Sequence, residues 1–124
     1  MINNRFNVVY YLLCICKLKT FDMKLEHEDY LLAKKITDET LKLDDEKIEF
    51  HIQDSLKSFI GNMNTSDYDT RSKIFLFLQH ISSLFLNYCI NSEVYFLSKE
   101  EIEKSYKGRD VIANICKDFR ESGF

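Results

Sequence analysis

The three histidines are the side chains of this chain best suited to proton transfer or metal binding, and each has a different setting. His27 lies between two acids, Glu26 and Glu28, a pattern that could serve a metal or a general base; we interpret it as the solvated first turn of a helix. His51 precedes Asp54 by three residues, which on a helix is typical of a surface pair. His80 lies in an apolar stretch, where a hydrogen-bonded core histidine is expected.

The four cysteines form no metal-binding or redox motif. Cys14 and Cys16 are two residues apart, which matches neither zinc-finger nor redox spacing and points the thiols in different directions on a helix. Cys89 and Cys116 have apolar neighbours, among which a free cysteine packs as a small hydrophobic residue. The cysteines are therefore predicted to be reduced and structural, in a cytoplasmic protein. The sequence also lacks a nucleophile elbow, a phosphate-binding glycine loop and a dinucleotide fingerprint, so no enzymatic activity is predicted.

Composition favours one helical domain over residues 1–124. The chain has no proline and only three glycines, whereas strands joined by tight turns usually need more of both. Its net charge is −3, and no predicted helix carries a basic stripe, so nucleic acid is not an expected partner. The sequence therefore predicts an all-α bundle.

The N-terminal segment imitates a signal peptide, because Arg5 is followed by the short apolar run 8–16. This run is too short to span a bilayer, and it leads into Lys17 and Lys19 rather than into a small-residue cleavage site. Similar apolar character recurs at residues 74–86, deep inside the chain. We interpret both stretches as buried core helices and predict no membrane association.

Hydrophobic periodicity divides the first half into three helices. The first covers residues 5–20, and the second covers residues 26–40. In the third, Asp44 is a candidate cap, and Gly61 is a C-terminal stop signal. The inward stripes expected of the second and third helices are Tyr30, Leu31, Ala33 and Ile36, and Ile48, Ile52, Leu56 and Phe59.

The second half is predicted to be more broken. A helix over residues 70–86 is followed by a turn at 87–91 and a short helix from Ser92, interrupted where Ser98 and Glu101 have capping-box spacing. Gly108 is expected to break the chain again. The last helix has the stripe Val111, Ile112, Ile115, Cys116 and Phe119, which brings the bundle to five to seven helices.

The two halves share a faint internal repeat at an offset of 65 residues. Residues 9–34 lie over residues 74–99, and in both copies an apolar stretch meets a polar turn and then an amphipathic segment. The identical pairs are Leu13/Leu78, Glu28/Glu93, Tyr30/Tyr95, Leu32/Leu97 and Lys34/Lys99. This pattern predicts two related helix–turn–helix units packed on each other.

Residues 21–28 and 86–93 resemble the acidic turns of the tellurite-resistance TerB family. In both segments an Asp or Asn (Asp22, Asn87) is followed by an aliphatic residue and then a glutamate, but Met23 and Tyr88 replace the family's turn glycines. The resemblance implies a TerB-like helical fold. It also implies a candidate divalent-cation site at Asp22, Glu26 and Glu28 in the first half. Because the second half offers fewer carboxylates, we expect a metal-free member without a cofactor.

Acidic residues concentrate in the first half, and Asp44, Asp45 and Glu46 are the candidate partner-binding residues. The function predicted is a non-enzymatic protein-interaction module that binds another protein. One alternative is a divalent-metal-binding stress-response protein. The other is a small helical inhibitor from a virus or mobile element that acts through the acidic face. The sequence leaves the oligomeric state open.

Overall fold

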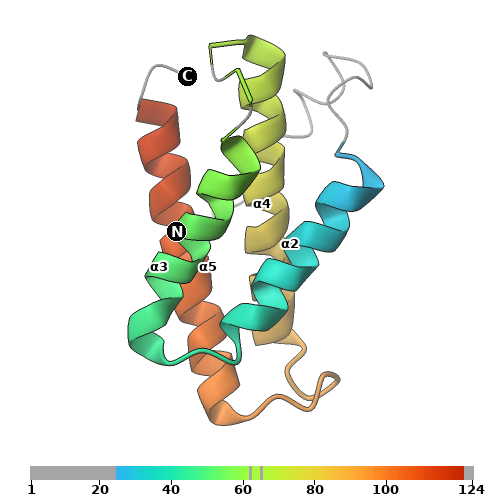
Figure 1. Ribbon diagram of the computed structural model, residues 1–124. Helices are drawn as coiled ribbons and strands as arrows, with labels where there is room; N and C mark the ends of the chain where they lie inside the picture. Colours follow the sequence, from blue (N-terminus) through green and yellow to red (C-terminus); the bar gives the residue numbers. More distant parts are fainter. Residues whose placement is uncertain (1–24, 62, 65, 122–124) are drawn as a thin grey trace.

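The computed structural model describes residues 25–61, 63–64 and 66–121. These residues form the helices α2 (His27–Thr40), α3 (Asp45–Ile60), α4 (Tyr68–Ile90) and α5 (Lys99–Glu121). Successive helices run in opposite directions, so that the α2–α3 and α4–α5 connections lie at one end and the α3–α4 connection at the other (Figure 1). The all-α class is confirmed, but the described residues form four helices rather than five to seven. The predicted helix at 5–20, with Cys14 and Cys16, lies outside the described residues.

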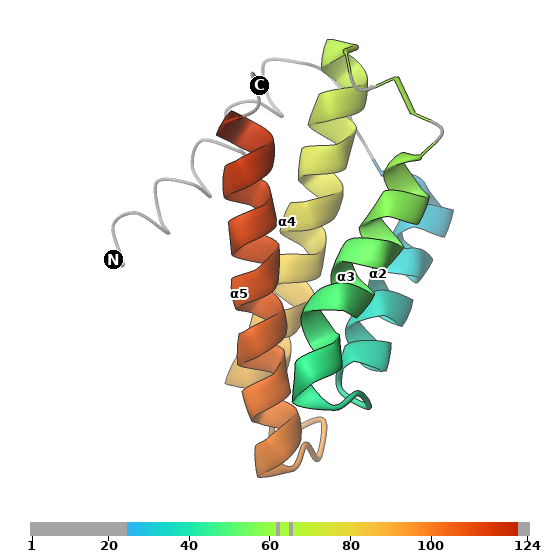
Figure 2. The same ribbon diagram turned by 60° about the vertical axis from the view of Figure 1, so that its left-hand side comes forward.

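The core is built around α4, which packs against α5 (Figure 2) and against α2 (Figure 1). Phe77, Leu78, Ile81 and Phe85 of α4 are fully buried. The stripe predicted for α3 is confirmed: Ile48, Ile52 and Leu56 are buried, and Phe59 stacks on Phe77 with ring centroids 3.9 Å apart. The α5 stripe is also confirmed, with Val111, Ile112 and Cys116 buried and Ile115 and Phe119 packed against the core.

The stripe predicted for α2 is only half right. Ala33 and Ile36 are buried, but Tyr30 and Leu31 are 42% and 56% exposed. The buried positions of α2 continue through Thr37 and Thr40, whose hydroxyls donate to the carbonyls of Ala33 and Ile36, each at 2.8 Å. These internal hydrogen bonds satisfy the threonine side chains and let polar residues face the core.

Local signals set the helix starts with mixed agreement. Ser98 and Glu101 form the predicted capping box at the start of α5: the Ser98 amide donates to Glu101 Oε1 (2.8 Å) and the Glu101 amide to Ser98 Oγ (3.1 Å). Asp44 occupies the N-cap of α3 as predicted, but its carboxylate makes no capping hydrogen bond. Asp67 caps α4 by accepting from the Thr70 amide at 3.0 Å, which starts that helix two residues earlier than predicted.

Gly108 does not break the chain, because α5 continues through it. A Cβ atom at this position would lie 2.5 Å from Cζ of Phe85. Both residues are fully or nearly fully buried, so the missing side chain makes room for the phenyl ring against the α5 backbone. The glycine is therefore a packing site between α4 and α5 rather than a helix stop.

The turn predicted at 87–91 and the helix predicted from Ser92 are also wrong. Helix α4 runs to Ile90, and residues 91–98 form the connection to α5. Of the residues matched by the repeat, Tyr30 and Leu32 lie within α2, whereas Tyr95 and Leu97 lie in this connection. The capping box at Ser98 explains the difference. It fixes the start of α5 at Lys99, seven residues after Ser92, where the repeat predicts a helix to begin.

Among the described residues, one helix is long and apolar enough to cross a membrane by length and composition alone, and it is α4. Its buried residues face α2 and α5 within the bundle. Of the 18-residue apolar window in α4, 33% is buried inside the bundle.

Candidate functional site

The histidines do not converge on one site. His27 is exposed at the start of α2. The Nε2 atom of His51 lies 3.6 Å from Glu39 Oε1 on α2, beyond hydrogen-bond distance, and the predicted pair with Asp54 is not formed. Among the described residues this buried nitrogen has no hydrogen-bond partner. The imidazole of His80 packs edge-on against the ring of Tyr30 at 4.8 Å, and burial lowers the pKa of His80. His80 is thus half-buried rather than in the core, and its described contact is with an aromatic ring.

The acids of the predicted metal site have local structural roles where they are described. Asp29, next to Glu28, accepts a hydrogen bond from the Glu26 amide at 2.9 Å and lies 3.4 Å from Lys73 Nζ on α4. Glu26 is the N-cap residue of α2, and Glu28 lies in its first turn. Asp22 lies outside the described residues. Within the described part of the chain, no group of three or more His, Cys, Asp or Glu side chains could hold a metal ion.

The two described thiols are protonated rather than reactive. Cys89 and Cys116 are both free, as predicted. Burial raises the pKa of Cys89, and it raises that of the buried Cys116 to about 11. A nucleophilic cysteine instead needs a lowered pKa and access to solvent. These thiols therefore belong to the packing of α4 and α5.

The predicted partner-binding acids lie at the N-terminal end of α3, all exposed. Two lysines stand beside them: Lys47 Nζ is 3.9 Å from Asp44, and Lys107 Nζ is 3.9 Å from Asp45 and donates to the Asp45 carbonyl at 2.7 Å. Such exposed pairs contribute little stability, but they offset part of the negative charge. Glu46 adds a further carboxylate to this surface.

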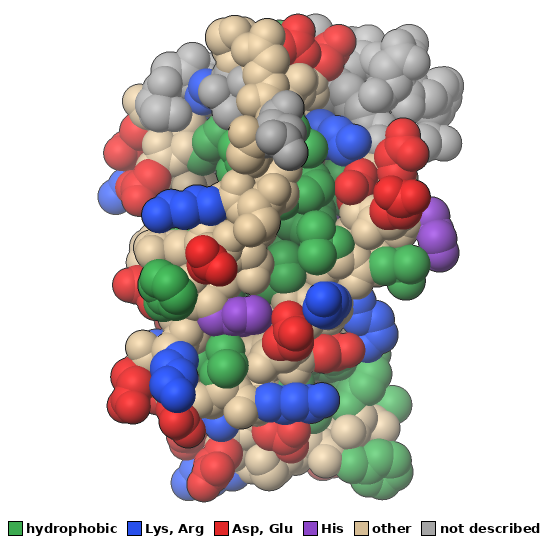
Figure 3. All heavy atoms as spheres, in the orientation of Figure 1, with side chains coloured by type: hydrophobic (Ala, Val, Ile, Leu, Met, Phe, Trp, Pro, Cys, Tyr) green, Lys and Arg blue, Asp and Glu red, His purple; other side chains and the backbone are tan. Residues whose placement is uncertain are grey.

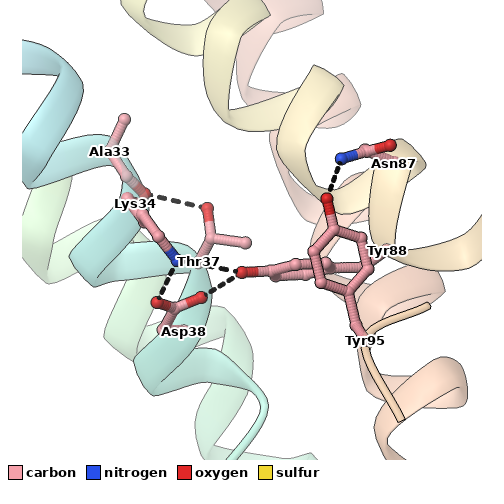
Figure 4. Close-up of polar contacts among 7 residues, drawn as sticks. All are labelled: Ala33, Lys34, Thr37, Asp38, Asn87, Tyr88 and Tyr95. Carbon is pink, nitrogen blue, oxygen red and sulfur yellow. Dashed lines mark hydrogen bonds and ion pairs between the residues drawn. The ribbon is translucent and has the colours of Figure 1, made fainter. Parts of the chain in front are cut away.

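A polar network joins α2 to the C-terminal half of α4 (Figure 4). Tyr88 donates from its hydroxyl to Asp38 Oδ1 at 2.5 Å, and Lys34 Nζ donates to Asp38 Oδ2 at 2.8 Å and to the Tyr88 oxygen at 3.3 Å. The hydrogen bond to Asp38 raises the pKa of Lys34, and burial raises the pKa of Tyr88. Both groups keep their protons at neutral pH, so the network is suited to fixing structure rather than to transferring protons.

The same network extends into the α4–α5 connection. The ring of Tyr95 packs edge-on against Tyr88, with centroids 4.8 Å apart, and its hydroxyl accepts from Asn87 Nδ2 at 2.7 Å (Figure 4). Asn91 donates from Nδ2 to Asn87 Oδ1 at 2.6 Å. The connection is therefore held to α4 by side-chain contacts as well as by the chain itself.

The backbone of the connection closes as a Schellman motif. The Leu97 amide donates to the Ser92 carbonyl at 3.0 Å and the Phe96 amide to the Glu93 carbonyl at 3.3 Å, the two bonds that define this ending. The motif places Phe96 in the left-handed region, with φ 54°, and it is the one described non-glycine residue with positive φ. A bulky residue there costs about 1–2 kcal/mol, a cost that glycine avoids.

The connection displays apolar side chains that the fold does not bury. We name Ile90, Val94, Tyr95 and Phe96 the apolar tip. Ile90 and Val94 are 68% and 70% exposed, and Phe96 is 92% exposed. Figure 3 shows hydrophobic side chains gathered at the lower right, over the end of the bundle that carries the α4–α5 connection. Clustered exposed apolar side chains mark interaction sites, whereas scattered single ones need no explanation.

The apolar tip was missed by reasoning from the sequence. The internal repeat placed Tyr95 and Leu97 on an amphipathic segment rather than in a connection between helices. The usable signal was the run Val94–Leu97 enclosed between Asn91 and the capping box at Ser98, because that interval is too short for a second stable helix.

Comparison with known proteins identified no matching family model, no matching curated protein and no matching solved structure. The TerB-like interpretation of residues 21–28 and 86–93 stays a prediction.

Proposed function

We propose that this chain is a non-enzymatic protein-interaction module and that it binds a protein partner through the apolar tip. The observation that carries the proposal is the exposure of Ile90, Val94, Tyr95 and Phe96 within seven consecutive residues. Large apolar and aromatic side chains supply most of the binding energy of protein interfaces. Their display on a connection fixed by hydrogen bonds lowers the entropy lost on association.

The rest of the sequence-based interpretation is part of the same proposal. The all-helical architecture supports a TerB-like helical fold, and the free thiols of Cys89 and Cys116 support a cytoplasmic location. Nucleic acid and membrane are not proposed partners. The acids Asp44, Asp45 and Glu46 lie at the same end of the bundle as the tip and favour a partner with basic groups (Figure 1).

Affinity capture with matched variants tests the proposal. One variant replaces Ile90, Val94 and Phe96 with serine, and the control Phe50→Ser removes another exposed aromatic side chain, on α3. We expect one protein to be captured by the wild type and by Phe50→Ser but lost with the tip variant, and to bind the wild type again after purification. Capture of the same proteins by all three chains would contradict the proposal.

Charge reversal separates the inhibitor alternative from the tip. If an inhibitor acts through the acidic face, Asp44→Lys, Asp45→Lys and Glu46→Lys together should abolish binding while the tip variant retains it, and salt should weaken binding strongly. We expect the reverse ranking, with the tip variant the more damaging.

A metal titration tests the other alternative. Calcium, magnesium, manganese and zinc are added separately to metal-stripped protein while thermal stability and heat of binding are followed. We expect no saturable shift with any of them. A saturable shift that disappears in Asp22→Ala would instead establish the metal-binding function, with Glu26 and Glu28 as the next residues to replace.

A further inference from the structure

We infer that Phe96 is the anchor residue of the apolar tip and that its partner is a different protein that offers an apolar pocket bordered by lysine or arginine. This inference rests on the proposed function and adds the residue and the chemistry of the partner. Three observations carry it: the backbone conformation of Phe96, the fixed geometry around it, and the charge of the flanking residues.

Among the described residues, no packing contact gives a reason for phenylalanine at position 96. The ring is 92% exposed, so it contributes almost nothing to the core. The left-handed backbone at φ 54° favours glycine, which would close the same Schellman motif without strain. A side chain that neither packs nor suits its backbone is one whose contribution comes from a contact outside the described fold.

The ring is displayed from a fixed support. Leu97 and Phe96 make the two backbone bonds of the motif, and the adjacent Tyr95 is held by the Asn87 side chain and the Tyr88 ring. On the other side, the capping box at Ser98 begins α5. Phe96 thus projects between two anchored neighbours, which is the geometry of a rigid aromatic anchor that fills a pocket.

The charge of the residues that flank the apolar tip in sequence favours one class of partner over the others. Residues 91–104 contain four acids and two lysines: Glu93, Glu100, Glu101 and Glu103, with Lys99 and Lys104. Nucleic acid and anionic lipid would meet charge of their own sign. Two copies of the chain meeting through their tips would likewise bring together two segments of net negative charge. A protein pocket bordered by basic side chains complements both the ring and its surroundings.

Photo-crosslinking from position 96 identifies the occupant directly. Placing p-benzoylphenylalanine at position 96 keeps an aromatic ring there, and the same residue at position 50 is the matched control. We expect irradiation of cells of the encoding organism to link position 96, but not position 50, to one different protein. The linked peptide should contain apolar residues beside lysine or arginine. Links to lipid, to a second copy of the chain or to nucleic acid would overturn the inference, as would no link.

The linked protein is then purified and titrated by calorimetry against variants at this one position. Phe96→Gly should weaken binding about tenfold or more, whereas Phe96→Tyr should stay within about threefold of the wild type and added salt should weaken both. Phe96→Gly should also raise the melting temperature by about 3–6 °C, which excludes misfolding as the cause. If Phe96→Gly binds like the wild type while the triple tip variant does not, the proposed function stands and the inference fails.

Discussion

Two places in this molecule hold a residue that its backbone does not favour, and they differ in what explains it. Gly108 lies in the middle of α5, where alanine would form a better helix, and the Phe85 ring occupies the space of the missing side chain. Phe96 lies in a left-handed position that favours glycine, and its ring is exposed. Packing accounts for the first residue, whereas nothing inside the described fold accounts for the second.

The largest expected effect on stability is at the packed contact between Gly108 and Phe85. Phe85→Ala should lower the free energy of unfolding by about 3–5 kcal/mol, because a fully buried ring is lost and a cavity is left between α4 and α5. Urea unfolding followed by circular dichroism measures it. A loss below about 1 kcal/mol would mean that the ring does not pack on α5 as described.

Gly108→Ala should cost less, about 1–3 kcal/mol. The new Cβ would overlap the Phe85 ring at 2.5 Å, and this overpacking exceeds the gain of about 1 kcal/mol in helix propensity. In a Phe85→Leu background, Gly108→Ala should cost less free energy of unfolding than it does in the wild type, because the smaller side chain leaves room for the Cβ. An equal cost in both backgrounds would show that Gly108 does not make room for the Phe85 ring.

The stability of the packed core should also depend on pH in the alkaline range, through Cys116 of α5. The pKa of Cys116 is about 11 in the fold against 9.0 as the ordinary value, so between pH 9 and 11 the unfolded chain releases this proton and the folded chain retains it. The contribution of this thiol to the free energy of unfolding is therefore complete below pH 9. It falls by about 2 kcal/mol as the pH rises toward 11. Cys116→Val should flatten that part of a stability-against-pH curve, and an unchanged slope would contradict the assignment.

The smallest effect belongs to the support of the tip. Asn87→Ala removes the hydrogen bonds to the Tyr95 hydroxyl and to the Asn91 side chain and should lower the free energy of unfolding by about 0.5–1 kcal/mol. Amide exchange at Phe96 and Leu97 should become faster, because the connection loses side-chain contacts to α4. Asn114→Ala, at an exposed position of α5, is the matched control. Unchanged exchange at the connection would show that the backbone motif alone holds it.

Hydrophobic periodicity was sufficient to predict the buried positions of a helix where one face of that helix meets the core. The stripes of α3 and α5 and the capping box at Ser98 follow from local spacing, and all three are confirmed. The expected break at Gly108 failed because its reason lies on another helix, in Phe85. A one-dimensional pattern carries no information about which ring will lie against a glycine.

The candidate site was harder to predict than the fold for a related reason. Apolar residues such as Val94 and Phe96 normally indicate a core. Here they are exposed, because α4 ends at Ile90 and α5 starts at Lys99, which leaves them in the connection between the two helices. The strain at Phe96 is a property of φ rather than of residue type, and a sequence does not state it.

The contacts between α2 and α4 have a further consequence for how uniquely the chain folds. Asp29 meets Lys73 near one end of α2, and Asp38 meets Tyr88 nearer the other. Apolar surfaces tolerate several alignments of two helices, since burial is not directional. Sliding α2 by one turn, about 5.4 Å, would separate both pairs at once and leave the partly buried Tyr88 hydroxyl without its bond to Asp38. We therefore expect these two pairs to select one register of α2 along α4, and so a single native state.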